Sequence, residues 1–193
     1  LSDLVVFGKL AGNGAADYVK KLASRPKPVE EQVVALVRRA TAPLHREAGE
    51  NPFVVVDALQ DTMTKHVNIV RDKAGLEQGI VELQELKKRA EAVKVHPSSQ
   101  YNPGWNSALD LRNMLITSEA VARAALMREE SRGAHTRIDF FSERDDPWLK
   151  VNIVTKKGPD GAMLIEQVVR PAPPEDLRII ANATLEDLEA GKV

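Results

Sequence analysis

The sequence predicts a mainly α-helical protein, with an antiparallel bundle of three to four helices followed by a small α+β C-terminal domain that contains a β-hairpin. Apolar residues recur every three to four positions along most of residues 29–125, which is the period of amphipathic helices. Proline and glycine interrupt this pattern, and the short connections that result favour antiparallel neighbours. After Pro147 the period changes to strict alternation, which is typical of strands.

The amino-acid composition argues against several classes of function. The 193 residues suffice for one domain with a small appendage, and a core drawn from 43% hydrophobic but only 4% aromatic residues must be aliphatic. A net charge of −1 argues against binding to nucleic acid, which requires a basic face. With no cysteine, the chain has no disulfide and no thiolate iron–sulfur site.

No apolar run reaches the roughly 18 residues of a membrane span, so no direct membrane insertion is expected. The first residue is leucine, and the chain is expected to be a piece of a longer protein.

The first helix is expected from Ser2 to Leu22, with Ser2-Asp3 as capping residues and Pro26 beyond its end. Three glycines interrupt it, at positions 8, 12 and 14. Because no strand precedes them and no Gly-Lys-Ser/Thr follows, close packing against another backbone explains them better than a phosphate loop does.

Three further helices follow, the first two with a proline at the start and the third after a polar break at Asp72 to Gly75. The second has Pro28 in its first turn and is bent or ended by Pro43, and the third starts at Pro52. The charged residues between Glu82 and Glu91 are expected to form a solvated face of the fourth. The three predicted apolar faces are Val29, Val33, Leu36, Val37 and Ala40; Val56, Leu59, Met63, Val67 and Val70; and Leu76, Ile80, Leu83, Leu86, Ala90 and Val93.

The last long helix is expected to begin at Asn106 or Ser107, after a turn at Pro103-Gly104. Its predicted apolar face consists of Leu111, Leu115, Ser118, Ala122 and Ala125. A hairpin over residues 149–168, turning at 158–161, comes next. The tail is expected to hold a short strand at Leu177 to Ile180 and a frayed helix at Leu185 to Leu188.

The sequence shows no catalytic or metal-binding motif. Its four histidines, His45, His66, His96 and His135, lack the i, i+4 pairing of a helical metal site, so no metal is expected. Adjacent acids such as Asp145-Asp146 point apart and suit neither role of an acid–base pair. Ser131 lacks the frame of a nucleophile elbow.

The densest mixture of charges lies between Met127 and Lys150, where arginines alternate with acids. Such a segment is either a solvated loop or a polar seam against another surface, and composition alone favours the loop. The order of its residues adds a further observation. Glu130-Ser131-Arg132-Gly133-Ala134-His135, then Glu143-Arg144-Asp145-Asp146 and Trp148-Leu149-Lys150, resembles the C-terminal region of the flavoprotein subunit of succinate dehydrogenase and fumarate reductase.

The resemblance extends over Leu1 to Lys156, and includes Val67-Asn68-Ile69-Val70-Arg71. The chain departs from the family pattern at Val151-Asn152, where a His-Thr pair is typical, and this suggests an outlying branch. The resemblance implies FAD in the intact subunit, with Leu1 matching a residue that touches the flavin. It places the catalytic residues before Leu1, so this chain is expected to have none and to bind no flavin firmly by itself.

The resemblance also implies an organisation and partners. Residues 1–25 would be a helix trailing from the flavin-binding domain, 26–133 the helical bundle domain and 134–193 the small C-terminal domain. Arg132, His135 and Arg137 are expected to tie the bundle to the N-terminal flavin domain, with Glu130 or Asp139 as local partners. An iron–sulfur subunit and a membrane anchor would hold the intact subunit at the cytoplasmic face of the inner membrane. The alternatives are a free-standing helical interaction module without redox activity and part of an L-aspartate oxidase-like flavoenzyme.

Overall fold

The computed structural model describes residues 1–141 and 146–191, without the side chains of residues 146 and 188. The chain forms two compact units, Leu1–Ala42 and Pro43–Val193. The structure is mainly helical with small two-stranded sheets, as the sequence predicts. No helix in the described part of the chain is both long enough and apolar enough to cross a membrane. The three-part domain division of the sequence stays a prediction.

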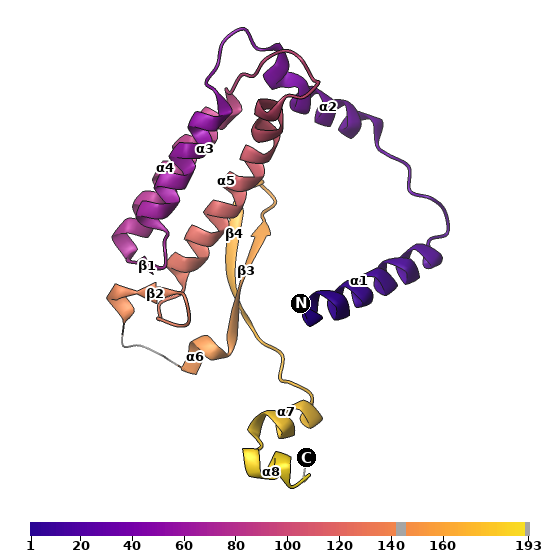
Figure 1. Cartoon of the computed structure of the whole chain (residues 1–193), viewed down its shortest axis with the longest axis vertical. Helices are drawn as coiled ribbons and strands as arrows, with labels where there is room; N and C mark the ends of the chain where they lie inside the picture. The colour runs from indigo at the N-terminus through magenta and orange to yellow at the C-terminus, as the bar shows by residue number, and fades with distance from the viewer. Residues whose placement is uncertain (142–145, 192–193) are drawn as a thin grey trace. The chain divides into compact units, whose positions relative to one another are not determined.

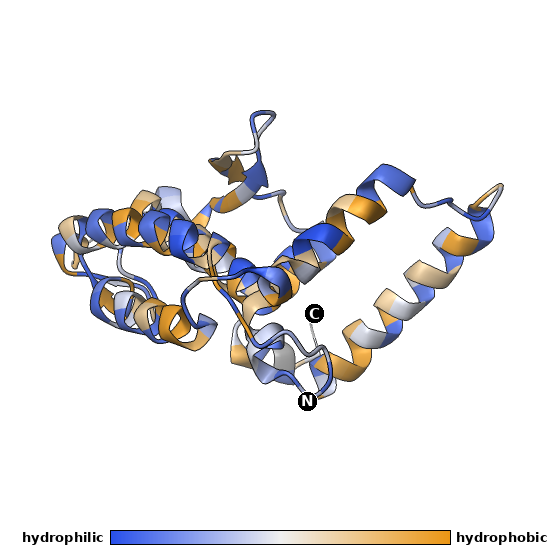
Figure 2. Cartoon of the chain, turned by 90° about the horizontal axis from the view of Figure 1, so that it is seen from above, coloured by the Kyte–Doolittle hydropathy of each residue, from blue (hydrophilic) through white to orange (hydrophobic). Residues whose placement is uncertain are grey.

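The first unit contains α1 (Ser2–Lys21) and most of α2 (Glu30–His45). No residue of α1 is buried, although the hydropathy colouring of Figure 2 shows hydrophobic residues along it. The predicted cap was wrong, because Leu1 is the N-cap and makes no side-chain bond to the helix. A Cβ at Gly8, Gly12 or Gly14 would meet nothing within 4 Å, so no described residue packs closely against these glycines.

The second unit is built on three helices, α3 (Pro52–His66), α4 (Lys73–Glu91) and α5 (Pro103–Met127), which pack against one another (Figure 1). The α2 helix passes through Pro43, which was expected to bend or end it, and Pro43 accepts a backbone bond from Val95. The core is aliphatic, as expected: Val55, Leu59, Val67, Leu76, Leu83, Leu86, Val93, Leu111, Leu115, Ala122 and Ala125.

Each bundle helix begins at a polar cap. Asn51 accepts a bond from the amide of Phe53, and the carboxylate of Asp72 accepts one from the amide of Gly75 at 2.7 Å. Asn102 does the same for Trp105, with Pro103 in the first turn. The prediction of Asn106 or Ser107 as the cap was therefore wrong.

The buried faces differ from the predicted ones at a few positions. In α3 the buried residues include Val55 and Thr62, whereas Val56 is only partly buried and Val70 is exposed beyond the helix. In α4, Gly79 lies against α3, where an added Cβ would come within 2.9 Å of the Cβ of His66. The close helix approach at Gly79 is a feature that sequence periodicity does not specify.

A buried carboxylate links α4 to α5. Glu119 is 4% exposed and accepts hydrogen bonds from Gln84, Lys87 and Arg123. Burial acts to raise the pKa of Glu119, but the bonds from Lys87 and Arg123 outweigh burial and lower it. The charged stretch of α4 is thus not only the solvated face that was predicted, because Lys87 belongs to an interhelical network.

The predicted hairpin is confirmed as β3 (Val151–Lys157) and β4 (Met163–Val169), antiparallel with Val151 opposite Val169. Both strands contact α5, and the short α6 (Asp146–Leu149) precedes them. In the tail, α7 (Glu175–Asn182) stands where a strand was predicted at Leu177 to Ile180, and α8 (Leu185–Glu189) confirms the helix predicted at Leu185 to Leu188.

Candidate functional site

Two short parallel strands bring the charged segment to the start of α4. The strand β1 (Val70–Arg71) pairs with β2 (Thr136–Arg137), and the amide of Thr136 donates to the carbonyl of Ile69 at 3.0 Å. The turn before β2 is closed by reciprocal backbone bonds between Arg132 and His135. Gly133 adopts a φ of 58° in this turn, a conformation that suits glycine. We call this set of elements, with the residues that bond to them, the strand-pair site.

Arg137 is the centre of the strand-pair site and is 1% exposed. Its Nε and Nη2 donate to the two carboxylate oxygens of Asp139 at 2.8 and 2.7 Å. Its Nη1 donates to the carbonyls of Ala125, Leu126 and Arg128, at 2.9 to 3.2 Å. These carbonyls lie at the C-terminal end of α5, where the helix leaves acceptors without partners and favours a positive charge. Arg137 therefore caps the C-terminal end of α5.

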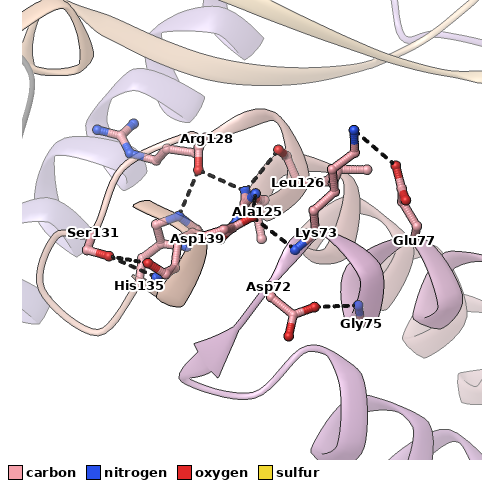
Figure 3. Close-up of polar contacts among 11 residues, drawn as sticks. Asp72, Lys73, Gly75, Glu77, Ala125, Leu126, Arg128, Ser131, His135 and Asp139 are labelled. Atoms are coloured by element: carbon pink, nitrogen blue, oxygen red, sulfur yellow. Dashed lines mark hydrogen bonds and ion pairs between the residues drawn. The ribbon is translucent and has the colours of Figure 1, made fainter. Parts of the chain in front are cut away.

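Asp139 connects this arginine to the next helix. Its Oδ2 accepts a bond from the backbone amide of Lys73 at the start of α4, so one carboxylate joins the end of α5 to the beginning of α4 (Figure 3). The bond from Arg137 is the main reason why the pKa of Asp139 is lowered. The residue Ser131, whose hydroxyl bonds the backbone of Arg137, has a structural role here.

A second carboxylate, that of Glu130, pairs with Arg128 and Arg132. Glu130 is fully buried and accepts bonds from Arg128 Nε at 2.8 Å and from Arg132 Nε and Nη2 at 3.0 and 2.8 Å. Burial acts to raise the pKa of Glu130, and the bonds from Arg132 and Arg128 outweigh it, so the pKa is lowered. Both predicted local partners, Glu130 and Asp139, thus bond to arginines of the predicted set.

His135 is half-buried beside these cations. Its Nε2 lies 3.0 Å from the carbonyl of Arg128, so this nitrogen carries the proton and donates it (Figure 3). Burial, and then the positive charges of Arg71, Arg137 and Arg128, lower the pKa of His135, although the bond to the carbonyl opposes them. The ring is therefore a neutral hydrogen-bond donor at neutral pH.

Arg71 is the residue of this site that sequence reasoning did not single out as functional. Its Nε is buried and has no hydrogen-bond partner. Burial and the nearby charge of Arg137 lower its pKa. The only sequence signal was its position in the Val67–Arg71 stretch of the family resemblance, because the pairing that places Arg71 beside Arg137 is visible only in the structure.

Both sequence features considered for cofactor contact, Leu1 and the glycine series, lie at or in α1. Leu1, the predicted flavin contact, is fully exposed at the start of α1. The glycines of α1 lie inside a helix instead of in a loop after a strand, so they offer no phosphate cradle. No group of three or more potential metal ligands occurs within residues 1–141 and 146–191. The part that Arg132, His135 and Arg137 play between domains stays a prediction, and Glu143, Arg144 and Asp145 of the motif lie outside the described residues.

Comparison with known proteins supplies the wider context. The model of the family described as "Fumarate reductase flavoprotein C-term" matches residues 56–181. The chain is 31% identical to the succinate dehydrogenase flavoprotein subunit of Coxiella burnetii over 159 residues, which cover 82% of this chain and 27% of that protein. It is 33% identical to the fumarate reductase flavoprotein subunit of Haemophilus influenzae over 149 residues, 76% of this chain and 24% of that protein.

A solved structure also matches nearly the whole chain. A chain of the Mycobacterium smegmatis Sdh1 complex in the apo form superposes with a TM-score of 0.84 at 40% identity, over 97% of this chain and 34% of that chain. The chain spans about a quarter of the length of the curated relatives it matches. It belongs to the fumarate reductase flavoprotein C-terminal family, and corresponds to the C-terminal part of the succinate dehydrogenase and fumarate reductase flavoprotein subunits.

Proposed function

We propose that this chain is the C-terminal part of an FAD-dependent flavoprotein subunit that interconverts succinate and fumarate. The observation that carries the proposal is the match to the M. smegmatis Sdh1 complex, at 40% identity over 97% of the chain. The names of the two curated relatives support it, because one is a succinate dehydrogenase subunit and the other a fumarate reductase subunit.

The role of this part is structural. FAD, bound in the remainder of the subunit, would supply the two-electron chemistry, and Leu1 would contact it there. Residues 1–25 would lead from the flavin domain, residues 26–133 would brace it, and residues 134–193 would form the small C-terminal domain. The exposed apolar side chains of α1 and α2, among them Phe7 and Leu36, would be covered in the intact subunit.

The strand-pair site would hold the two parts of the subunit together. Arg132 and His135 are only partly buried at its outer side, whereas Arg137 is enclosed behind them. We place the interdomain contact on this site because its charges are ordered by internal ion pairs before any partner binds, which lowers the cost of docking. An iron–sulfur subunit and a membrane anchor would complete the complex and keep it peripheral on the cytoplasmic face of the inner membrane.

The test compares the chain alone with the intact subunit. The chain should melt cooperatively by circular dichroism and show no succinate-dependent dye reduction. The intact subunit should show flavin absorbance that bleaches with succinate. An intact subunit without flavin would contradict the proposal in favour of a helical interaction module. Bleaching by L-aspartate and not by succinate would contradict it in favour of an aspartate oxidase-like enzyme.

A further inference from the structure

We propose that Arg71 is a docking residue, and that it binds a carboxylate on the flavin-binding part of the same subunit. This inference rests on the function proposed above, which places that part against the chain. It adds a residue outside the expected set of Arg132, His135 and Arg137, and it specifies the chemistry of the group that meets it.

The first argument is an unmet hydrogen bond. The Nε of Arg71 is buried and has no acceptor, and none of the ion pairs of the described residues includes Arg71. Buried polar groups in native proteins are nearly always bonded, and a buried cation without a partner is costly. The intact protein therefore has to provide an acceptor.

The second argument is that the neighbouring acids are already occupied. Glu130 bonds Arg128 and Arg132, and Asp139 bonds Arg137 and the amide of Lys73. The carboxylate of Asp72 caps α4. Among the described residues of the site, no acid remains for Arg71, so we place its acceptor outside residues 1–141 and 146–191, on the flavin-binding part.

The third argument concerns charge. The positive charge of Arg137 faces Arg71, and the charge of Arg71 in turn acts on His135. The described part of the site thus holds four arginines against the three carboxylates of Asp72, Glu130 and Asp139. A carboxylate would relieve this excess and match the planar guanidinium with two oxygens, whereas a carbonyl would add no charge.

The fourth argument is the surface around Arg71. Ile69 and Val70 precede it, Ile138 follows Arg137, and all three side chains are more than half exposed. The sheet has only two strands, so each strand has an unpaired edge. An arginine beside exposed apolar side chains, which would exclude water once a partner covers them, is typical of the residues that dominate binding at protein interfaces.

The flavin-binding part of the subunit is the occupant that the observations favour. The chain covers about a quarter of the length of its curated relatives, so most of each relative lies outside the matched region. A part joined covalently to this chain meets the site at a high effective concentration, which a separate protein does not. A single carboxylate contact is then enough to contribute to docking.

The experiment replaces Arg71 by methionine both in this chain and in the intact subunit. In the chain alone, R71M should not lower the melting temperature, because Arg71 has no partner to lose and the change removes an unpaired charge beside Arg137. In the intact subunit, R71M should increase the rate of proteolysis between the two parts at least about fivefold and weaken flavin retention, as expected when an interface arginine is truncated.

Two control variants set the expected limits, one without effect and one destabilising. Arg112→Met, an exposed arginine on α5, should be silent in both proteins. Arg137→Met should destabilise both, because its partners lie within the chain. If R71M lowers the melting temperature of the chain as R137M does, Arg71 is an internal structural residue and the inference is wrong.

The remaining outcomes separate this inference from the proposed function. An intact subunit that holds flavin and bleaches with succinate, but whose R71M variant resists proteolysis and keeps flavin, refutes the docking role and leaves the function standing. The same holds if R71M weakens only the binding of another subunit. Absence of flavin from the unmodified intact subunit would instead refute the function.

Discussion

Replacing Arg137 by methionine should be among the most destabilising single changes in the second unit. The side chain donates to both oxygens of Asp139 and to three carbonyls at the end of α5. Methionine has a similar length and no charge, so it leaves Asp139 and these carbonyls without their donor. Removing one partner of a buried ion pair typically costs about 3–5 kcal/mol. Asp139 is partly exposed, which places the expected loss towards the lower end.

The measurement is urea unfolding followed by the helical circular dichroism signal. R137M should lower the midpoint without changing the slope, because the surface exposed on unfolding stays the same. Arg137→Lys should recover part of the loss, since an ammonium supplies charge but not the planar set of donors. If R137M lowers the free energy of unfolding by less than about 1 kcal/mol, which is the value for an exposed ion pair, the view that Arg137 stabilises the end of α5 is wrong.

Three further predictions concern the bundle. Leu115→Ala, at a site 1% exposed, should cost about 2–5 kcal/mol by urea unfolding, and an unchanged midpoint would mean that the core assignment is wrong. Gly79→Ala should destabilise by about 1–3 kcal/mol because the new methyl group meets His66, whereas Gly8→Ala should not, since nothing lies within 4 Å. The pKa of Glu119 is lower in the folded state than in the unfolded state. Its contribution to the free energy of unfolding is therefore full above the unfolded pKa of about 4.3 and is lost as the pH falls through the folded pKa. When the free energy of unfolding is measured against pH, Glu119→Gln should reduce its fall at acid pH.

The hydrophobic periodicity, together with the positions of proline and glycine, was enough to predict the bundle and the hairpin. They failed where two signals competed. Pro103-Gly104 was interpreted as a turn, but proline also suits the first turn of a helix, and Asn102 provides the cap. The β-branched pair Ile179-Ile180 favoured a strand, yet Glu175 at the start of α7 suits the positive end of a helix.

Contacts between distant segments were beyond the reach of the sequence. Glu119 lies beside the predicted apolar face, and only the donors from α4 explain how a carboxylate is accommodated there. The composition of the charged segment favoured a solvated loop. The alternative, a polar seam with Glu130 or Asp139 as local partners of its arginines, gave the ion pairs that the structure shows. Arg71 could not be assigned, because its importance depends on a strand pairing with residues far along the chain.

The pairing of β1 with β2 also has a consequence for the order of folding. The two strands lie on either side of α4 and α5 in the sequence, so their pairing closes a long loop and gains only a few bonds in return. It becomes favourable only after the helical hairpin has brought its ends together. The amide of Thr136, which donates to Ile69, should therefore be protected late during refolding, and its hydrogen exchange in the native protein should report local opening at this end of the bundle.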